Sequence, residues 1–285
     1  MNTICLVLDG LHTGFLGPYG NTWIHTPAFN LLASHAFTFD CALIDSPQID
    51  RLYDSYWHIK HALAPAPDGP SFPTRIRQAD LTPVLMSDEP CVLAHPLAAD
   101  FEKHVRIASP DGPRPIAEEL EETHFASCFA QLIDWLDQAP EQFFLWCHLG
   151  GLRMVWDAPA EYRTAYAAPD DPEPFLGVEP PRCQLPTDYD PDDLFGIVQA
   201  YAGQVALVDT CLGGLLGMLD ETPLGENTAL AVLGARGFPL GEHRQVGLDK
   251  LLLYGELVHV PAMICLPDGR GAAARSPELV QPADL

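Results

Sequence analysis

Basic residues are scarce in this chain. Lys and Arg total 15 against 39 Asp and Glu, which gives 285 residues a formal net charge of −24. Such an acidic surface repels phosphate backbones and anionic lipids, so we expect neither nucleic acid nor a membrane as a partner. The chain start lacks the basic segment of a signal peptide, and no apolar run is expected to span a membrane. These absences predict a cytoplasmic protein.

Paired cysteines are also absent. None of the eight cysteines belongs to a Cys-x-x-Cys pair, which excludes a zinc ribbon. Cys5, Cys147 and Cys265 lie inside apolar runs, where a thiol behaves as a small hydrophobic group, so we expect reduced thiols. With 47% hydrophobic and 19% charged residues, the composition excludes disorder, collagen and coiled coil. We treat residues 1–285 as a single globular domain.

Short apolar runs alternate with amphipathic segments along the chain. The expected strands are 3–8, 37–44, 83–87, 143–149, 228–233 and 260–266, and the expected helices are 27–35, 50–63, 117–138 and 194–219. The proline-rich segment 64–83 reads as a loop. Eight prolines and many acids between 157 and 193 predict a long surface excursion, with Asp192 capping the next helix. This alternation predicts an α/β fold with a mainly parallel central sheet flanked by helices.

Ligands of such sheets bind beyond the carboxyl ends of the strands. The residues there are Asp9-Gly10, Asp45-Ser46, 148–153 and 234–237. We expect the functional residues among them.

Four blocks, in order, resemble the sulfatases of the alkaline phosphatase superfamily. They are LVLDGLHTGFLGPYGNTWIHTPAFN, FFLWCHLGGLRMVWDAPAEY, NTALAVLGARGFPLGEH and LLLYGELVHVPAMICLPDG. The resemblance implies the α/β fold of that family, which usually continues into a smaller C-terminal sheet. The last residues, SPELVQPADL, resemble the start of the helix that leads there, so we expect the C-terminal subdomain to be missing or reduced. A sheet edge left exposed would favour homo-oligomers.

Sulfatases hydrolyse sulfate esters with a divalent cation, usually calcium, and a formylglycine made from Cys or Ser in Cys/Ser-x-Pro-x-Arg. The metal neutralises the ester oxygens and orients the nucleophile. Here three expected metal positions hold Gly10, Ala235 and Arg236, and only Asp9 remains. The nucleophile position holds Asp45, so no formylglycine can form there. The resemblance therefore implies a metal site reduced to one ligand, and we expect no cofactor.

Two arginines enter the same region. Arg153 replaces the histidine of the family's Pro-His, and Arg236 replaces that of its Asp-His-Gly. A guanidinium can fill the space of a lost cation, so we hypothesise that Arg153 or Arg236 pairs with Asp9 or Asp45. The same arginines are candidate contacts for an anionic ligand.

The remnant catalytic candidates are Asp45, His243 and Lys250, by their positions in the resembling blocks. Each has a structural alternative. Asp45 could form an Asx turn before Pro47, His243 could be an ordinary loop residue, and Lys250 could lie on a solvated turn. Likewise, Asp9 could simply cap a turn after its strand.

Three functional hypotheses follow. The first is a sulfatase-like pseudoenzyme that binds a small anionic ligand or a protein partner through the old cleft. The second is an active hydrolase of sulfuric or phosphoric esters, with Asp45 as nucleophile or base and calcium or another divalent cation. The third is a structural subunit that uses 157–193 as a contact surface.

Overall fold

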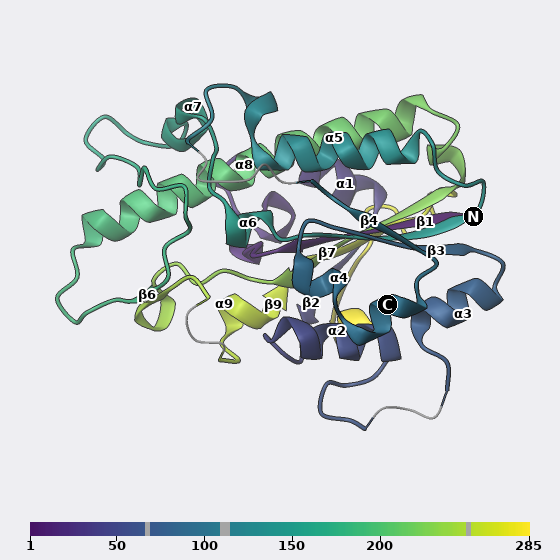
Figure 1. The fold of residues 1–285 in the computed structure, drawn as a ribbon. Helices are drawn as coiled ribbons and strands as arrows, with labels where there is room; N and C mark the ends of the chain where they lie inside the picture. The colour runs from purple at the N-terminus through teal and green to yellow at the C-terminus, as the bar shows by residue number, and fades with distance from the viewer. Residues whose placement is uncertain (66–68, 109–114, 249–251) are drawn as a thin grey trace.

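A nine-stranded sheet runs through the computed structural model, which describes residues 1–65, 69–108, 115–248 and 252–285 (Figure 1). Its strands are β1 (Asn2–Asp9), β2 (Phe37–Leu43), β3 (Thr82–Ser87), β4 (Lys103–Arg106), β5 (Phe143–Leu149), β7 (Thr228–Arg236), β9 (His259–Val260), β10 (Ala262–Cys265) and β11 (Arg275–Val280). Their order is β11-β2-β10-β7-β1-β5-β3-β4, with β9 paired to β2. Among the described strands of this sheet, only the pairs made by β9 and β10 are antiparallel. The predicted α/β fold with a mainly parallel sheet is confirmed.

The central strand β1 is buried on both faces. Ile4, Leu6 and Leu8 belong to one hydrophobic cluster, and the alternating Cys5 and Val7 belong to another on the opposite face. Because successive side chains of a strand point to opposite faces, the unbroken apolar run is what a doubly covered sheet requires.

Helices cover both faces of the sheet. They are α1 (Pro27–His35), α2 (Ile49–His58), α3 (Phe72–Gln78), α4 (Pro90–Leu93), α5 (His124–Leu136), α6 (Gly151–Met154), α7 (Ala160–Thr164), α8 (Pro191–Glu221) and α9 (Gly255–Val258). In Figure 1, α1, α5 and α8 lie above the sheet, and α2 and α3 lie below it. Phe29, Leu132 and Leu212 join the upper cluster, whereas Tyr53 and Trp57 join the lower one.

Helix α8 departs from the expectation in length and in its cap. It begins at Pro191 and is capped by Asp190, whose carboxylate accepts from the backbone N of Asp192. Among the described residues it is the one helix long and apolar enough to span a membrane, contrary to the expectation of no such stretch. However, 61% of its most apolar window is buried inside the fold. A helix that contacts α1, α5 and α7 must be apolar over more than one stripe.

Proline chemistry explains two further differences. Segment 64–83 is not all loop, because Ser71 caps α3 and Pro73 occupies its first turn, where a missing N–H costs nothing. The expected strand 260–266 is split by Pro261 into β9 and β10.

The C-terminal residues also differ from the expectation, because SPELV forms the edge strand β11 beside β2 and not the start of a helix. Other differences concern helix ends and the surface excursion. Helix α2 ends at His58 because Ile59 adopts a left-handed conformation (φ 54°). Helix α5 begins later than predicted, at His124, where Thr123 provides the cap. The excursion 157–193 is mostly irregular, with α7 and the short strand β6 (Cys183–Gln184), which pairs with β8 (Gln245–Val246).

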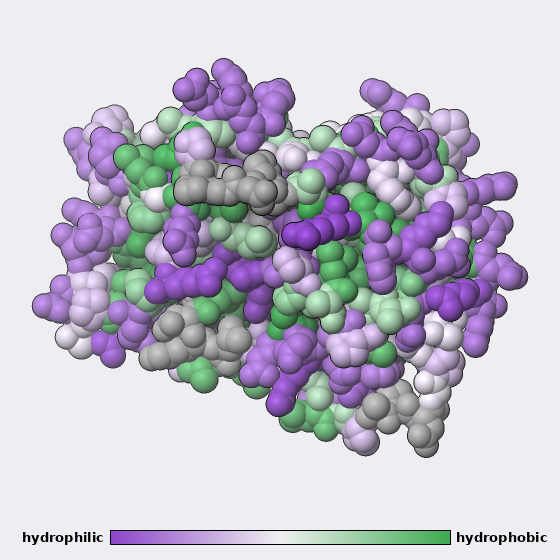
Figure 2. Space-filling model, in the orientation of Figure 1, coloured by the Kyte–Doolittle hydropathy of each residue, from purple (hydrophilic) through white to green (hydrophobic). Residues whose placement is uncertain are grey.

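The surface mixes polar and apolar residues. Figure 2 shows hydrophilic side chains spread over the face of the Figure 1 view, with smaller hydrophobic patches between them. The most exposed large hydrophobic residues belong to separate segments: Leu63, Leu176, Leu253 and Leu279. Scattered apolar residues of this kind are normal for a protein surface.

A buried carboxylate on α8 holds the start of α1. Asp209 is 2% exposed, and its oxygens accept from the backbone N of Ala28 (3.1 Å) and Phe29 (2.9 Å). Burial raises the pKa of Asp209 to about 6, although the two amide donors act to lower it. The helix N-terminus therefore receives a cap from another element rather than from its own Thr26, which makes no side-chain cap bond.

We predict that Asp209 makes stability fall as the pH rises from about 4 to above 6. Its folded pKa lies above the unfolded value, so the stabilisation is complete below the unfolded pKa and is lost through the folded pKa. The shift corresponds to about 3 kcal/mol. Urea unfolding across this pH range should show that difference between the wild type and Asp209→Asn. Parallel pH profiles for the two proteins would contradict the prediction.

Candidate functional site

Four neighbouring strands end at one edge of the sheet and bring charged side chains together there. Asp9 ends β1 and Arg236 ends β7, while Glu89 follows β3 and Arg153 lies on α6 directly after β5. Because β7, β1, β5 and β3 are adjacent and parallel, their carboxyl ends converge.

These four residues, hereafter the Asp9 network, form a chain of ion pairs. Arg236 donates from Nε to Asp9 Oδ1 (2.9 Å) and from Nη2 to Asp9 Oδ2, and Arg153 donates from Nε to Asp9 Oδ2 (3.2 Å). Arg153 also pairs with Glu89. Two positive and two negative groups therefore compensate each other. Arg236 Nη1 donates to the carbonyl of Pro47 (3.1 Å), which ties the network to the segment after β2.

The network keeps Asp9 ionised although its side chain is fully buried. Burial alone would raise the pKa of Asp9, but Arg236, with smaller effects of His148 and Arg153, lowers it to about 2. The pKa of Arg236 is raised, because the pull of Asp9 outweighs burial. The pKa of Arg153, by contrast, is lowered, since burial outweighs its carboxylate partner.

The residues present do not fit calcium. Both oxygens of Asp9 accept from guanidinium groups, and a hard cation needs several free oxygen ligands. The second expected aspartate is Gly10, whose backbone is left-handed (φ 83°). A Cβ there would lie 3.1 Å from Arg153 N and 3.2 Å from Leu152 Cβ, so an aspartate would be strained as well as crowded. Ala235 supplies no ligand atom.

Asp45 lies outside the Asp9 network. Its Oδ2 accepts from Ser55 Oγ (3.0 Å) and from the backbone N of Ala62, so it connects α2 to the turn that follows. Asp45 does not form the alternative Asx turn, because Pro47, two residues on, has no N–H to donate; Ser46 Oγ instead accepts from the N of Gln48 (3.2 Å). Its catalytic role stays a prediction.

His243 occupies an exposed, conformationally unusual loop. Its backbone is left-handed (φ 53°), its ring stacks on Tyr254 with centroids 3.7 Å apart, and Nδ1 lies 2.8 Å from Glu256 Oε1. Lys250 lies outside the described residues, and the assignments of both residues stay predictions. His148, which belongs to the segment 148–153 expected beyond the strand ends, is buried and bonds through Nδ1 to Tyr53 Oη (2.6 Å).

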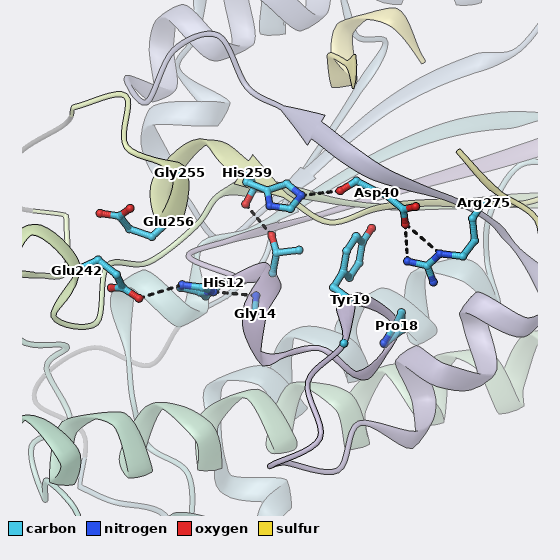
Figure 3. A pocket seen from close by; sticks show the side chains of 12 residues that line it. His12, Gly14, Pro18, Tyr19, Asp40, Glu242, Gly255, Glu256, His259 and Arg275 are labelled. Atoms are coloured by element: carbon cyan, nitrogen blue, oxygen red, sulfur yellow. Dashed lines mark hydrogen bonds and ion pairs between the residues drawn. The ribbon is translucent and has the colours of Figure 1, made fainter. Parts of the chain in front are cut away.

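A cavity of about 740 Å³, which sequence analysis did not predict, lies beyond the end of β1. Figure 3 shows His12, Glu242 and Glu256 on one side of it, and Tyr19 and the paired Asp40 and Arg275 on the other, with His259 between. His12 Nε2 lies 3.5 Å from Glu242 Oε1. Burial raises the pKa of Glu242, but His12 and the N–H of Leu240 outweigh it and lower the pKa. The cavity therefore presents carboxylates and imidazoles.

Sequence patterns also did not indicate Glu89 as a residue of the site. It follows β3 in the run Ser-Asp-Glu-Pro, which carries no recognised motif, and only the fold brings it to Arg153. The sequence partly indicated the cavity residues, since Glu242 belongs to one of the four blocks that resemble the sulfatases. Asp40 and Arg275 are more than 200 residues apart in sequence, and no sequence motif indicated that they would pair.

Comparison with known proteins identifies the family of the chain. A sequence model of the sulfatase family, described as "Sulfatase", matches residues 66–285. This chain belongs to the sulfatase family. Human iduronate 2-sulfatase is 23% identical over 98% of this chain and 61% of its own length, and the mouse enzyme is 23% identical over 95% and 60%. The chain thus spans about three fifths of these curated relatives.

Solved structures share the sulfatase-family fold. Phosphonate monoester hydrolase of Agrobacterium radiobacter superimposes with a TM-score of 0.78 at 16% identity, covering 99% of this chain and 71% of that one. A protein in complex with its substrate D-glucosamine-2-N,6-O-disulfate gives 0.77 at 15% identity, covering 99% and 74%. At these identities the likeness shows the fold alone.

We predict that Arg236→Met lowers the free energy of unfolding by about 3–5 kcal/mol, because it leaves the buried Asp9 charge poorly compensated. The matched control is Arg275→Met, since Arg275 also pairs with an aspartate but is 44% exposed, and it should cost at most about 1 kcal/mol. Urea denaturation measures both. Adding Asp9→Asn to Arg236→Met should restore part of the loss. Equal effects of the two arginine substitutions would show that the Asp9 network is not a stabilising centre.

Proposed function

We propose that this chain is a non-hydrolytic member of the sulfatase family that binds its ligand without cleaving it. The observation that carries the proposal is that both oxygens of Asp9 accept from Arg236 and Arg153. An arginine-centred ion-pair set takes the place of the cation that would polarise the ester.

The residues at the nucleophile position support the same proposal. Asp45 cannot become formylglycine, and its Oδ2 already holds Ser55 and Ala62 in place. The neighbouring Ser46 is 7% exposed, and its Oγ accepts from a backbone amide. In the part of the chain that the structure describes, the hydrogen bond at Ser46 Oγ comes from a backbone amide and not from a base that would activate the hydroxyl.

The charge balance guides the choice of ligand site. Both arginines of the Asp9 network already pair with carboxylates, so an anion would have to compete with Asp9 and Glu89 for them. The cavity of Figure 3 offers Glu242 and Glu256 as carboxylates and His12 and His259 as imidazoles. Its volume lies within the range of small-molecule sites. We therefore place the ligand there and expect a neutral polyhydroxylated or cationic compound.

We predict no hydrolysis of 4-nitrophenyl sulfate or 4-nitrophenyl phosphate with calcium, magnesium, manganese or zinc. The reason is that Asp9 is bonded to arginines and cannot ligate the cation. The melting temperature should also stay constant in millimolar calcium, because a cation that does not bind the folded state cannot stabilise it. An absorbance assay of the full chain tests this, with an active sulfatase as the assay control. Calcium-dependent turnover that Asp9→Asn abolishes would refute the proposal.

A separate prediction concerns ligand charge. In saturation-transfer NMR, glucosamine and glucose should give stronger signals than glucuronate, because the cavity lining has three carboxylates, Asp40, Glu242 and Glu256, and one guanidinium, Arg275. Glu256→Gln should reduce the preference for glucosamine over glucose. Glu226→Gln should not, because Glu226 is exposed and lies before the amino end of β7, at the opposite end of that strand from Glu242. A preference for glucuronate would instead favour an anionic ligand at the arginines.

A further inference from the structure

A second cluster of metal-ligating side chains lies apart from the Asp9 network. Asp88, directly after β3, meets His124 and Cys128 on α5, and all three are buried. His124 Nε2 lies 2.7 Å from Asp88 Oδ2 and 3.5 Å from Cys128 Sγ, and Cys128 Sγ lies 3.9 Å from Asp88 Oδ2. These residues, hereafter the Asp88 cluster, point one oxygen, one nitrogen and one sulfur toward a common centre.

Local structure explains why they converge. His124 and Cys128 are four residues apart on α5, so they share one face of the helix. Thr123 caps the helix, and Asp157 accepts from the backbone N of His124 (2.7 Å), which fixes the helix start over the end of β3. The backbone N of Gly150 donates to Asp88 Oδ1 (2.8 Å), so Oδ2 is turned toward the cluster.

We propose that the Asp88 cluster binds a borderline transition-metal cation of the zinc class. Bond lengths of about 2.0 Å to oxygen and nitrogen and about 2.3 Å to sulfur put tetrahedral ligand atoms about 3.3–3.6 Å apart. The nitrogen–sulfur separation already meets this value. The oxygen–nitrogen separation has to open by about 0.6 Å, which exchanges the Asp88–His124 hydrogen bond for two metal bonds. Cys128 binds as the thiolate and releases its proton to solvent as the metal is loaded during folding, and a water taken up with the metal completes the fourth position.

The donor set and the charges favour this class of ion. Thiolate and imidazole ligands suit zinc or cobalt and do not suit calcium or magnesium, which take oxygen ligands. Within the described residues no Lys or Arg forms an ion pair with Asp88, whose ionisable partners are His124 and Cys128. A dication would compensate the buried carboxylate, whose charge is otherwise costly to hold away from water.

The site would tie α5 to the sheet edge that carries the Asp9 network. Asp88 precedes Glu89 in sequence, and its Gly150 contact comes from the turn before Arg153. Metal bound here is structural, since all three protein ligands are buried and the fourth ligand, a water, is enclosed with the metal during folding. Buried ligands also imply that loading accompanies folding.

The test is to refold the full chain with one equivalent of zinc or cobalt and to remove excess metal by dialysis. We expect about one retained equivalent by elemental mass spectrometry and, for cobalt, a near-ultraviolet thiolate charge-transfer band. Cys128→Ser should lose the band, whereas Cys147→Ser, which changes another buried cysteine outside the cluster, should keep it. No retained metal, or a band that survives Cys128→Ser, overturns the proposal.

A second measurement covers the case in which Cys128→Ser does not fold. X-ray absorption of the zinc-loaded wild type should show one sulfur at about 2.3 Å and three nitrogen or oxygen neighbours at about 2.0 Å. A first shell without sulfur, or with two or more sulfurs, excludes the Asp88 cluster. Neither measurement depends on turnover, so the result is independent of the proposed function.

Discussion

The carboxylate of Asp9 at the end of β1 must be compensated, and the organisation of the sheet edge follows from this constraint. An ionised group without solvent exposure is tolerated only when it is paired and hydrogen-bonded. Arg236 meets the requirement from β7 and Arg153 from the turn after β5. Glu89 then balances Arg153 from the end of β3, and the carbonyl of Pro47 accepts from Arg236. One buried charge thus connects four strands and the segment after β2.

Under the proposed function, the same arrangement relates the family fold to binding without hydrolysis. A metal ion and an arginine both bring positive charge to a carboxylate. A guanidinium, however, presents fixed N–H donors and no open coordination position. Replacing one by the other can preserve the geometry of the strand ends while removing the Lewis acid. The cavity of Figure 3 lies outside this exchange, because other elements line it, and binding can therefore persist without hydrolysis.

The sequence predicted the frame of the site better than its contacts. Apolar runs placed the strands, so Asp9, Arg153 and Arg236 could be expected at converging ends. Pattern alone could not decide whether the arginines pair with Asp9 or Asp45, since that depends on side-chain reach in the folded sheet. Glu89 and the Asp40–Arg275 pair were missed because nothing local marks residues that the topology brings together. The Asp88 cluster shows both cases: the spacing of His124 and Cys128 is visible in the sequence, but their meeting with Asp88 is not.

The left-handed backbone at Gly10 makes the change of the site hard to reverse. Converting Gly10 to aspartate would meet the main chain of Arg153 before the new carboxylate could reach any ion. Restoring a set of metal ligands would also require the replacement of Arg236. Without Arg236 and before a cation binds, the buried charge of Asp9 would not be compensated. Each single substitution toward a metal site is therefore unfavourable, because both the backbone conformation at Gly10 and the ion pairs of Asp9 oppose it.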